Sequence, residues 1–211
     1  MVLYMNICSD MESKVLYPAL FAFTLLYLLL AFVWRSVLVW RRTGANPYVL
    51  PQDDSPQGYV GAAMRLLMAA VLLTTGVMAA VPQSADLMGL LPWLVSPALQ
   101  GGGWLLMAAA LGLTLVAQAQ MGASWRIGLD ARARTALVQS GVFARSRNPI
   151  FLAMRLMLLG LFLAAPQAVT LTLLVAGEVL MQVQVRLEEA YLHGVPGETY
   201  EAYRARVPRW L

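Results

Sequence analysis

An interrupted apolar run near the carboxyl terminus determines the fold. Residues 150–185 read IFLAMRLMLLGLFLAAPQAVTLTLLVAGEVLMQVQV, and the only charged residues among them are Arg155 and Glu178. The break at Ala165-Pro166-Gln167 divides the run into two apolar segments. A connection this short requires two neighbouring antiparallel helices. The run therefore predicts a tight helical hairpin within a membrane.

Three further apolar runs precede the hairpin, at about residues 15–40, 60–81 and 103–119. Each approaches the roughly 20 residues that span a bilayer as a helix. The chain is 60% hydrophobic and only 12% charged, whereas a soluble domain carries about 25% charged residues. The expected fold is therefore all-α and polytopic, with about five transmembrane helices and a cytoplasmic, helical C-terminal tail.

Two regions follow from this pattern. Residues 1–119 are expected to hold the first three transmembrane helices and their loops, and residues 120–211 the cofactor-binding and catalytic region with the hairpin. Residues 82–102 contain three prolines and lead into three consecutive glycines at 101–103. This stretch predicts an irregular outer loop, with the glycines giving a flexible entry to the third helix.

The arginines indicate the topology. They cluster after the first apolar run, between the third and fourth runs, and in the tail, whereas residues 82–102 and the 165–167 turn contain no Lys or Arg. The positive-inside rule then places the N-terminus outside and the C-terminus in the cytoplasm. Lys14 is the only lysine, and such arginine-rich composition favours a bacterial source and hence the bacterial plasma membrane.

The same composition argues against two kinds of partner. The arginines lie beside apolar spans, where membrane topology places them, so we expect no nucleic-acid binding. Cys8 and His193 are the only residues of their types. A disulfide within the chain, a thiolate cluster and a histidine-rich metal site are therefore excluded, and no metal is expected.

Polar side chains are concentrated in three segments that the topology brings to one membrane level. These are residues 120–126, 147–151 and 188–191, at the ends of the third, fourth and fifth spans. Together they offer carboxylates, guanidinium groups and aromatic rings, which suit a zwitterionic, aromatic cofactor at the lipid boundary. The alternative interpretation is a set of interfacial anchors and topology-determining arginines.

Arg155 and Glu178 lie inside the apolar hairpin, at about the same depth on either side of its turn. Isolated ionised groups are costly there and are rarely left unpaired. We therefore expect an ion pair that lines a polar cavity and serves catalysis. The alternative is an interhelical clamp that only fixes the register of the hairpin.

Several short motifs resemble those of the isoprenylcysteine carboxyl methyltransferase family, whose superfamily includes phospholipid methyltransferases. They occur in family order over residues 118–211: Gln120-x-Gly122, Trp125-Arg126, Gly141-Val-Phe, Arg147-Asn148-Pro149-Ile150-Phe151, Glu188-Glu189, Tyr200-x-x-Tyr203 and Val207-Pro208-Arg209. The family commonly has histidine in place of Asn148 and tyrosine in place of Phe151, and these differences leave the methyl acceptor open.

The resemblance implies an integral membrane methyltransferase that uses S-adenosylmethionine at the cytoplasmic membrane face. It implies cofactor-binding roles for Gln120, Gly122, Trp125, Arg126, Leu137, Gly141, Arg147, Asn148, Pro149, Phe151, Glu188 and Glu189. The acceptor would be lipophilic and would present a carboxylate, a hydroxyl or a lipid head group. Arg155 would position a carboxylate acceptor, with Glu178 orienting it.

Two other classes of function fit the apolar spans. One is a non-catalytic membrane scaffold or lipid-binding protein with the same fold. The other is a small transporter or channel, which should carry polar residues along several spans, whereas the first two runs are almost free of them.

Overall fold

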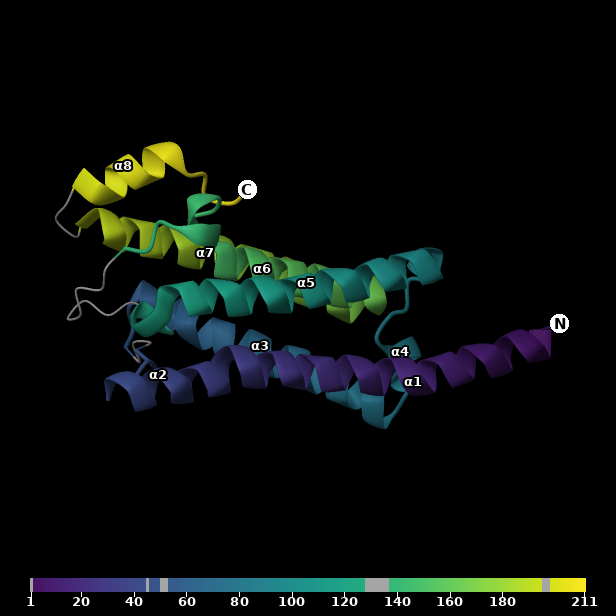
Figure 1. The fold of residues 1–211 in the computed structure, drawn as a ribbon. Coiled ribbons are helices and arrows are strands. Elements are labelled where there is room, and N and C mark those ends of the chain that lie inside the picture. The colour runs from purple at the N-terminus through teal and green to yellow at the C-terminus, as the bar shows by residue number, and fades with distance from the viewer. Residues whose placement is uncertain (1, 45, 50–52, 128–136, 195–197) are drawn as a thin grey trace.

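A computed structural model describes residues 2–44, 46–49, 53–127, 137–194 and 198–211, which form an elongated helical bundle (Figure 1). Its long elements are α1 (Val2–Leu28), which continues through a π-helical turn (Leu29–Trp34) into α2 (Arg35–Thr43), then α3 (Pro56–Ala80), α5 (Pro97–Met121), α6 (Pro149–Ala164) and α7 (Ala168–Gly194). The short elements are α4 (Ser84–Leu87), α8 (Glu198–Arg206) and 3₁₀ turns at Pro92–Leu94, Gly122–Ser124 and Gly141–Ala144. The described residues contain no β-strand, which confirms the all-α fold.

The lengths of these helices suit a membrane protein. Four of them are long and apolar enough to cross a bilayer, at Lys14–Thr43, Pro56–Ala80, Pro97–Met121 and Ala168–His193. Helix α6 is apolar but has 16 residues, or about 24 Å against a hydrocarbon core of about 30 Å. The polytopic fold is thus confirmed, with α6 as a shorter fifth helix.

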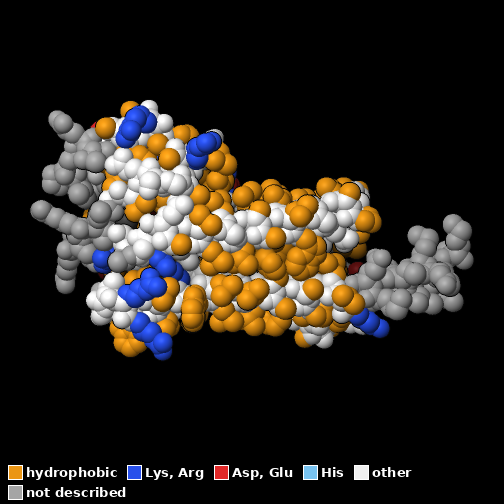
Figure 2. Space-filling model, viewed as in Figure 1, with side chains coloured by type: hydrophobic (Ala, Val, Ile, Leu, Met, Phe, Trp, Pro, Cys, Tyr) orange, Lys and Arg blue, Asp and Glu red, His pale blue; other side chains and the backbone are white. Residues whose placement is uncertain are grey.

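The surface has the corresponding pattern. In Figure 2 apolar side chains cover the middle of the bundle, and most of the visible Lys and Arg side chains lie at the end that carries α2 and α8. We call this the α8 end.

Proline fixes the start of three long helices. Pro56, Pro97 and Pro149 each occupy the first helical turn, where the missing N–H leaves no hydrogen bond unmade. The side chains of Ser55 and Ser96 cap α3 and α5 by accepting backbone N–H groups, at 3.1 and 3.2 Å. Asn148 does not cap α6 with its side chain, which leaves that side chain available for the site described below.

The glycines at 101–103 do not form a flexible loop, so that expectation was wrong. Helix α5 already begins at Pro97 and includes all three glycines. Gly103 faces Gly160 of α6: a Cβ on Gly103 would lie 2.6 Å from the Gly160 carbonyl oxygen. Gly103 and Gly160 therefore allow two helix backbones to touch, as small residues commonly do in membranes.

The hairpin of α6 and α7 forms as the sequence predicts. The loop between α3 and α5, which we call the outer loop after its predicted position, holds the turn of the hairpin. The backbone N–H of Leu91 donates to the Pro166 carbonyl at 2.9 Å, and that of Ala168 donates to the Gly89 carbonyl at 2.8 Å. These bonds satisfy backbone groups at the turn and fix the end of the bundle opposite the α8 end.

Candidate functional site

A buried arginine of α2 fixes the end of α5, from which the site begins. The Nη2 of Arg35 donates to the backbone carbonyls of Gln118 and of Gly122, the latter at 2.8 Å. The Gln118 side chain donates to the Ala31 carbonyl at 2.7 Å. These bonds satisfy carbonyls that the end of a helix leaves without partners, and they join the first helix to the start of the predicted cofactor segment.

Backbone pairing between two loops extends this segment across the α8 end of the bundle. The N–H of Ile127 donates to the Pro47 carbonyl at 2.8 Å, and the N–H of Val49 donates to the Ile127 carbonyl at 3.0 Å. Tyr48 lies between these two bonds. Its hydroxyl accepts a hydrogen bond from Nη1 of Arg65 in α3 at 2.9 Å. The paired loops hold Trp125 and Tyr48 over the space between the helices.

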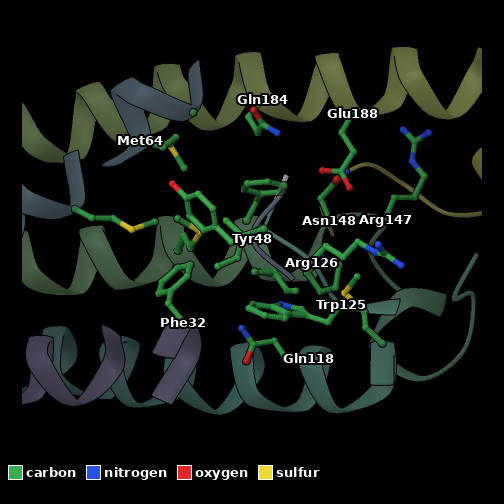
Figure 3. Close-up of a pocket in the computed structure, with 18 of the residues that line it drawn as sticks. Phe32, Tyr48, Met64, Gln118, Trp125, Arg126, Arg147, Asn148, Gln184 and Glu188 are labelled. Atoms are coloured by element: carbon green, nitrogen blue, oxygen red, sulfur yellow. The ribbon is translucent and has the colours of Figure 1, made fainter. Parts of the chain in front are cut away.

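A cavity of about 270 Å³ lies beneath these loops (Figure 3). Its wall is mainly apolar and comes from every long helix, and it includes Phe32, Met64, Met68, Met121, Trp125, Phe143, Ile150, Phe151 and Met154. Polar side chains at its margin include Tyr48, Arg65, Arg126, Arg147, Asn148, Gln184 and Glu188. We call this space the larger cavity, by comparison with the one that adjoins it.

A second cavity, of about 140 Å³, adjoins the larger one. The two share the wall formed by Met121, Phe143, Arg147, Asn148 and Glu188. The smaller cavity adds more polar groups, from Ser124, Glu189, Tyr200 and Tyr203, together with Leu137, Val138 and Leu192. An apolar and a polar compartment therefore meet at one set of residues.

The charged groups of the smaller cavity form a network centred on Glu189. This carboxylate, which is 5% exposed, lies 3.2 Å from Nη2 of Arg147. It accepts hydrogen bonds from Nε of Arg209 at 3.1 and 3.2 Å and from Nη2 of Arg209 at 2.6 Å. The Asn148 amide adds a longer bond at 3.5 Å. Glu189 is thus satisfied by its protein partners.

The neighbouring groups are not satisfied in this way. Glu188 points from α7 into the larger cavity (Figure 3), and its carboxylate has no hydrogen-bond or ion-pair partner among the described residues. Nε and Nη1 of Arg147 and the hydroxyl of Tyr200 are buried without hydrogen-bond partners in the described part of the chain. Buried polar groups are normally bonded, so these atoms indicate a place for a polar ligand.

Tyr203 helps to hold the wall. Its hydroxyl donates to the Phe143 carbonyl at 2.7 Å, and burial raises the pKa of Tyr203 to about 12. The phenol therefore remains a neutral donor at physiological pH, and it ties α8 to the loop before α6.

Three of the residues that the resemblance implicates form the scaffold behind the cavities. The Gln120 side chain accepts the N–H of Val142 at 2.9 Å and packs against Gly141. Gly122 and Gly141 have φ angles of 56° and 64°, a region that side chains with a Cβ rarely adopt. None of these three lines the larger or the smaller cavity.

The other candidates divide into two groups. Nine line at least one of the two cavities: Trp125, Arg126, Leu137, Arg147, Asn148, Pro149, Phe151, Glu188 and Glu189. Arg155 and Glu178 line neither. They do form an ion pair, as the sequence predicts, with Nε of Arg155 2.5 Å from Oε2 of Glu178. The pair is partly exposed on the hairpin, and its catalytic role stays a prediction.

Sequence reasoning missed several residues of the site. Arg65 was detectable, because it is an arginine inside an apolar run. Tyr200 and Arg209 belong to noted motifs, but nothing in their spacing showed that they reach α7. Phe32 and Met64 carry no local signal, since apolar residues in a span are usually packing. The described residues contain no group of three or more His, Cys, Asp or Glu side chains suited to a metal.

Comparison with known proteins supports the resemblance. The model of the phospholipid methyltransferase family matches residues 100–198, from the first turn of α5 to the first residue of α8. No curated protein and no solved structure matches the chain. The matched segment contains every implicated cofactor residue, whereas Tyr200, Arg209 and the first three helices lie outside it. This membrane protein is therefore similar to the phospholipid methyltransferase family over residues 100–198.

Proposed function

We propose that the protein is an integral membrane methyltransferase that transfers a methyl group from S-adenosylmethionine to a lipophilic acceptor. The observation that carries the proposal is the pair of adjoining cavities, one polar and one apolar, which share Arg147, Asn148 and Glu188. A reaction between a zwitterionic cofactor and a lipophilic acceptor requires two such compartments in contact.

The residues of the smaller cavity fit the methionine part of this cofactor. Its ammonium requires a carboxylate, and Glu188 is a carboxylate that no described residue engages. Its carboxylate requires a cation, and Arg147 has two buried donor atoms without partners in the described residues. The Asn148 amide and the Tyr200 hydroxyl lie on the same wall. When bound, the cofactor supplies a methyl group on a sulfonium, which a nucleophile takes by in-line displacement.

The larger cavity suits the acceptor. Met64, Met68, Met121 and Met154 line it, and methionine side chains adapt readily to flexible apolar ligands. Arg65 and Arg126 also lie on its wall, so it can receive an anionic group such as a carboxylate or a lipid phosphate. Trp125 and Tyr48 cover the cavity, and this cover helps to exclude water from the reacting groups.

Calorimetry with S-adenosylmethionine and the detergent-purified protein tests the proposal. We expect saturable binding, and we expect Glu188→Ala and Arg147→Ala each to weaken it at least about tenfold, or 1.4 kcal/mol. The matched controls are Glu201→Ala and Arg145→Ala, because both side chains are exposed and line neither cavity.

The controls should bind like the unchanged protein. Absence of binding by a well-folded sample would overturn the proposal and favour a non-catalytic scaffold. Equal losses in the site variants and the controls would also contradict it, because they would show that the cavity charges have no specific part in binding.

A further inference from the structure

The residues that follow α8 are bound to the rest of the protein. Residues 207–210, which we call the strap, return to the loop that precedes α6 (Figure 1). The Pro208 carbonyl accepts the backbone N–H of Arg147 at 3.0 Å. The Arg209 carbonyl accepts the Ser146 hydroxyl at 3.3 Å and the Asn148 amide at 3.2 Å. Two cavity residues, Arg147 and Asn148, are therefore held directly by the backbone of the strap.

The strap also contributes a charge to the site. The Arg209 guanidinium binds the Glu189 carboxylate through two of its nitrogen atoms. Because Glu189 pairs with Nη2 of Arg147 as well, Arg209 fixes the carboxylate that orients Arg147. In this orientation Nε and Nη1 of Arg147 have no described hydrogen-bond partner.

The end of the strap is anchored on the hairpin. The Trp210 ring lies over the Arg155 guanidinium, with 4.4 Å between Cζ and the ring centroid, a geometry typical of a cation–π contact. Glu178 holds Arg155 through Nε at 2.5 Å and accepts a bond from Gln182 at 2.8 Å. Gln182 in turn accepts from Arg186 at 2.7 Å. These hydrogen bonds hold the Arg155 guanidinium in place against the Trp210 ring.

We infer that the strap sets the affinity of the cofactor site, and that Arg155 and Glu178 are positioning residues that act on it through Trp210. The inference rests on the proposed function, and it assigns the hairpin ion pair a role that requires no contact with the acceptor. Trp210 anchors the end of the strap on the hairpin. The strap in turn binds Arg147 and Asn148, which line the smaller cavity.

The first test is made without cofactor. Hydrogen exchange of the Arg147 amide reports the bond to the Pro208 carbonyl, because an amide exchanges when its bond opens. We expect Trp210→Ala and Arg155→Ala to speed exchange in the segment around Arg147, and Arg155→Lys to restore part of the protection, since an ammonium can also sit over the ring. Trp93→Ala is the control, because Trp93 is 77% exposed in the outer loop.

The second test is S-adenosylmethionine binding by the same variants. We expect Trp210→Ala and Arg155→Ala to weaken binding about fivefold, or about 1 kcal/mol. The double variant should be no weaker than either single variant, because both changes break one contact. Trp210→Phe should retain most of the affinity.

The outcomes separate the inference from the proposed function. If the unchanged protein does not bind the cofactor, the proposed function fails. If it binds while the strap variants keep full affinity, the inference is overturned, even where their exchange is faster. Additive losses in the double variant would likewise overturn it, since Arg155 and Trp210 would then act separately.

Discussion

At the scale of single residues, two adjacent glutamates have different surroundings. Glu189 is bound by Arg147 and Arg209, whereas Glu188 extends into the cavities without a partner among the described residues. On α7 the two side chains point about 100° apart, because an α-helix turns by that angle per residue. Glu189 therefore meets the strap at the smaller cavity, and Glu188 also reaches the larger cavity.

This difference predicts opposite effects on stability. Glu189→Gln should destabilise the protein by about 3 kcal/mol, because it leaves two guanidinium groups without their carboxylate. Glu188→Gln should leave the free energy of unfolding unchanged or raise it, because it removes a carboxylate that lacks a described partner. Thermal unfolding of both variants in the same detergent measures their stability. Equal losses of stability in the two variants would contradict the prediction.

At the scale of secondary-structure elements, the contact between α5 and α6 depends on glycine. A Cβ on Gly103 would lie 2.6 Å from the Gly160 carbonyl oxygen and 2.7 Å from the Ala164 nitrogen, and both of these atoms belong to the backbone of α6. Backbone atoms cannot move aside as the end of a flexible side chain can. The distance between α5 and α6 is therefore set by the absence of two side chains.

Alanine at this contact should force the two helices apart. We expect Gly103→Ala to destabilise the protein by about 1–3 kcal/mol. Gly112→Ala, in the same helix, is a matched control, because a Cβ there meets no atom within 4 Å. The control should be neutral or stabilising by up to about 1 kcal/mol, through helix propensity. A comparable loss in both variants, measured by thermal unfolding, would refute the close contact.

At the scale of the whole molecule, the two ends of the bundle differ in charge and in chemistry. The α8 end carries the cavities and most of the visible cations, and the opposite end carries the outer loop around α4 (Figures 1 and 2). The distribution of arginines along the sequence predicts that the α8 end faces the cytoplasm. The cofactor would then reach its cavity from the compartment in which it is made.

Thiol labelling of intact cells tests this orientation. In a background of Cys8→Ser, we expect Leu87→Cys, at a position 91% exposed in the outer loop, to react with a membrane-impermeant reagent. Ser140→Cys, at an exposed position near α6, should react only after permeabilisation. The reverse pattern would invert the predicted topology and would place both cavities at the outer face of the membrane.

Much of this architecture was accessible from the sequence. The lengths of the apolar runs, the short turn at 165–167 and the matched depths of Arg155 and Glu178 are local properties, and they correctly predicted the helices, the hairpin and its ion pair. The order of the motifs also indicated the family that the comparison supports. Hydrophobic length and short connections suffice here, because a membrane permits few structures other than helices.

The arrangement of the site required the tertiary structure. Only the packing shows that Phe32 and Met64, outside the family segment, complete the larger cavity. Only the path of the strap shows that Arg209 binds Glu189 and not Glu188. It also shows that Arg155 contacts the Trp210 ring. The physical reason is that side-chain roles depend on helix rotation and on contacts between distant segments, and both are set by packing rather than by local pattern.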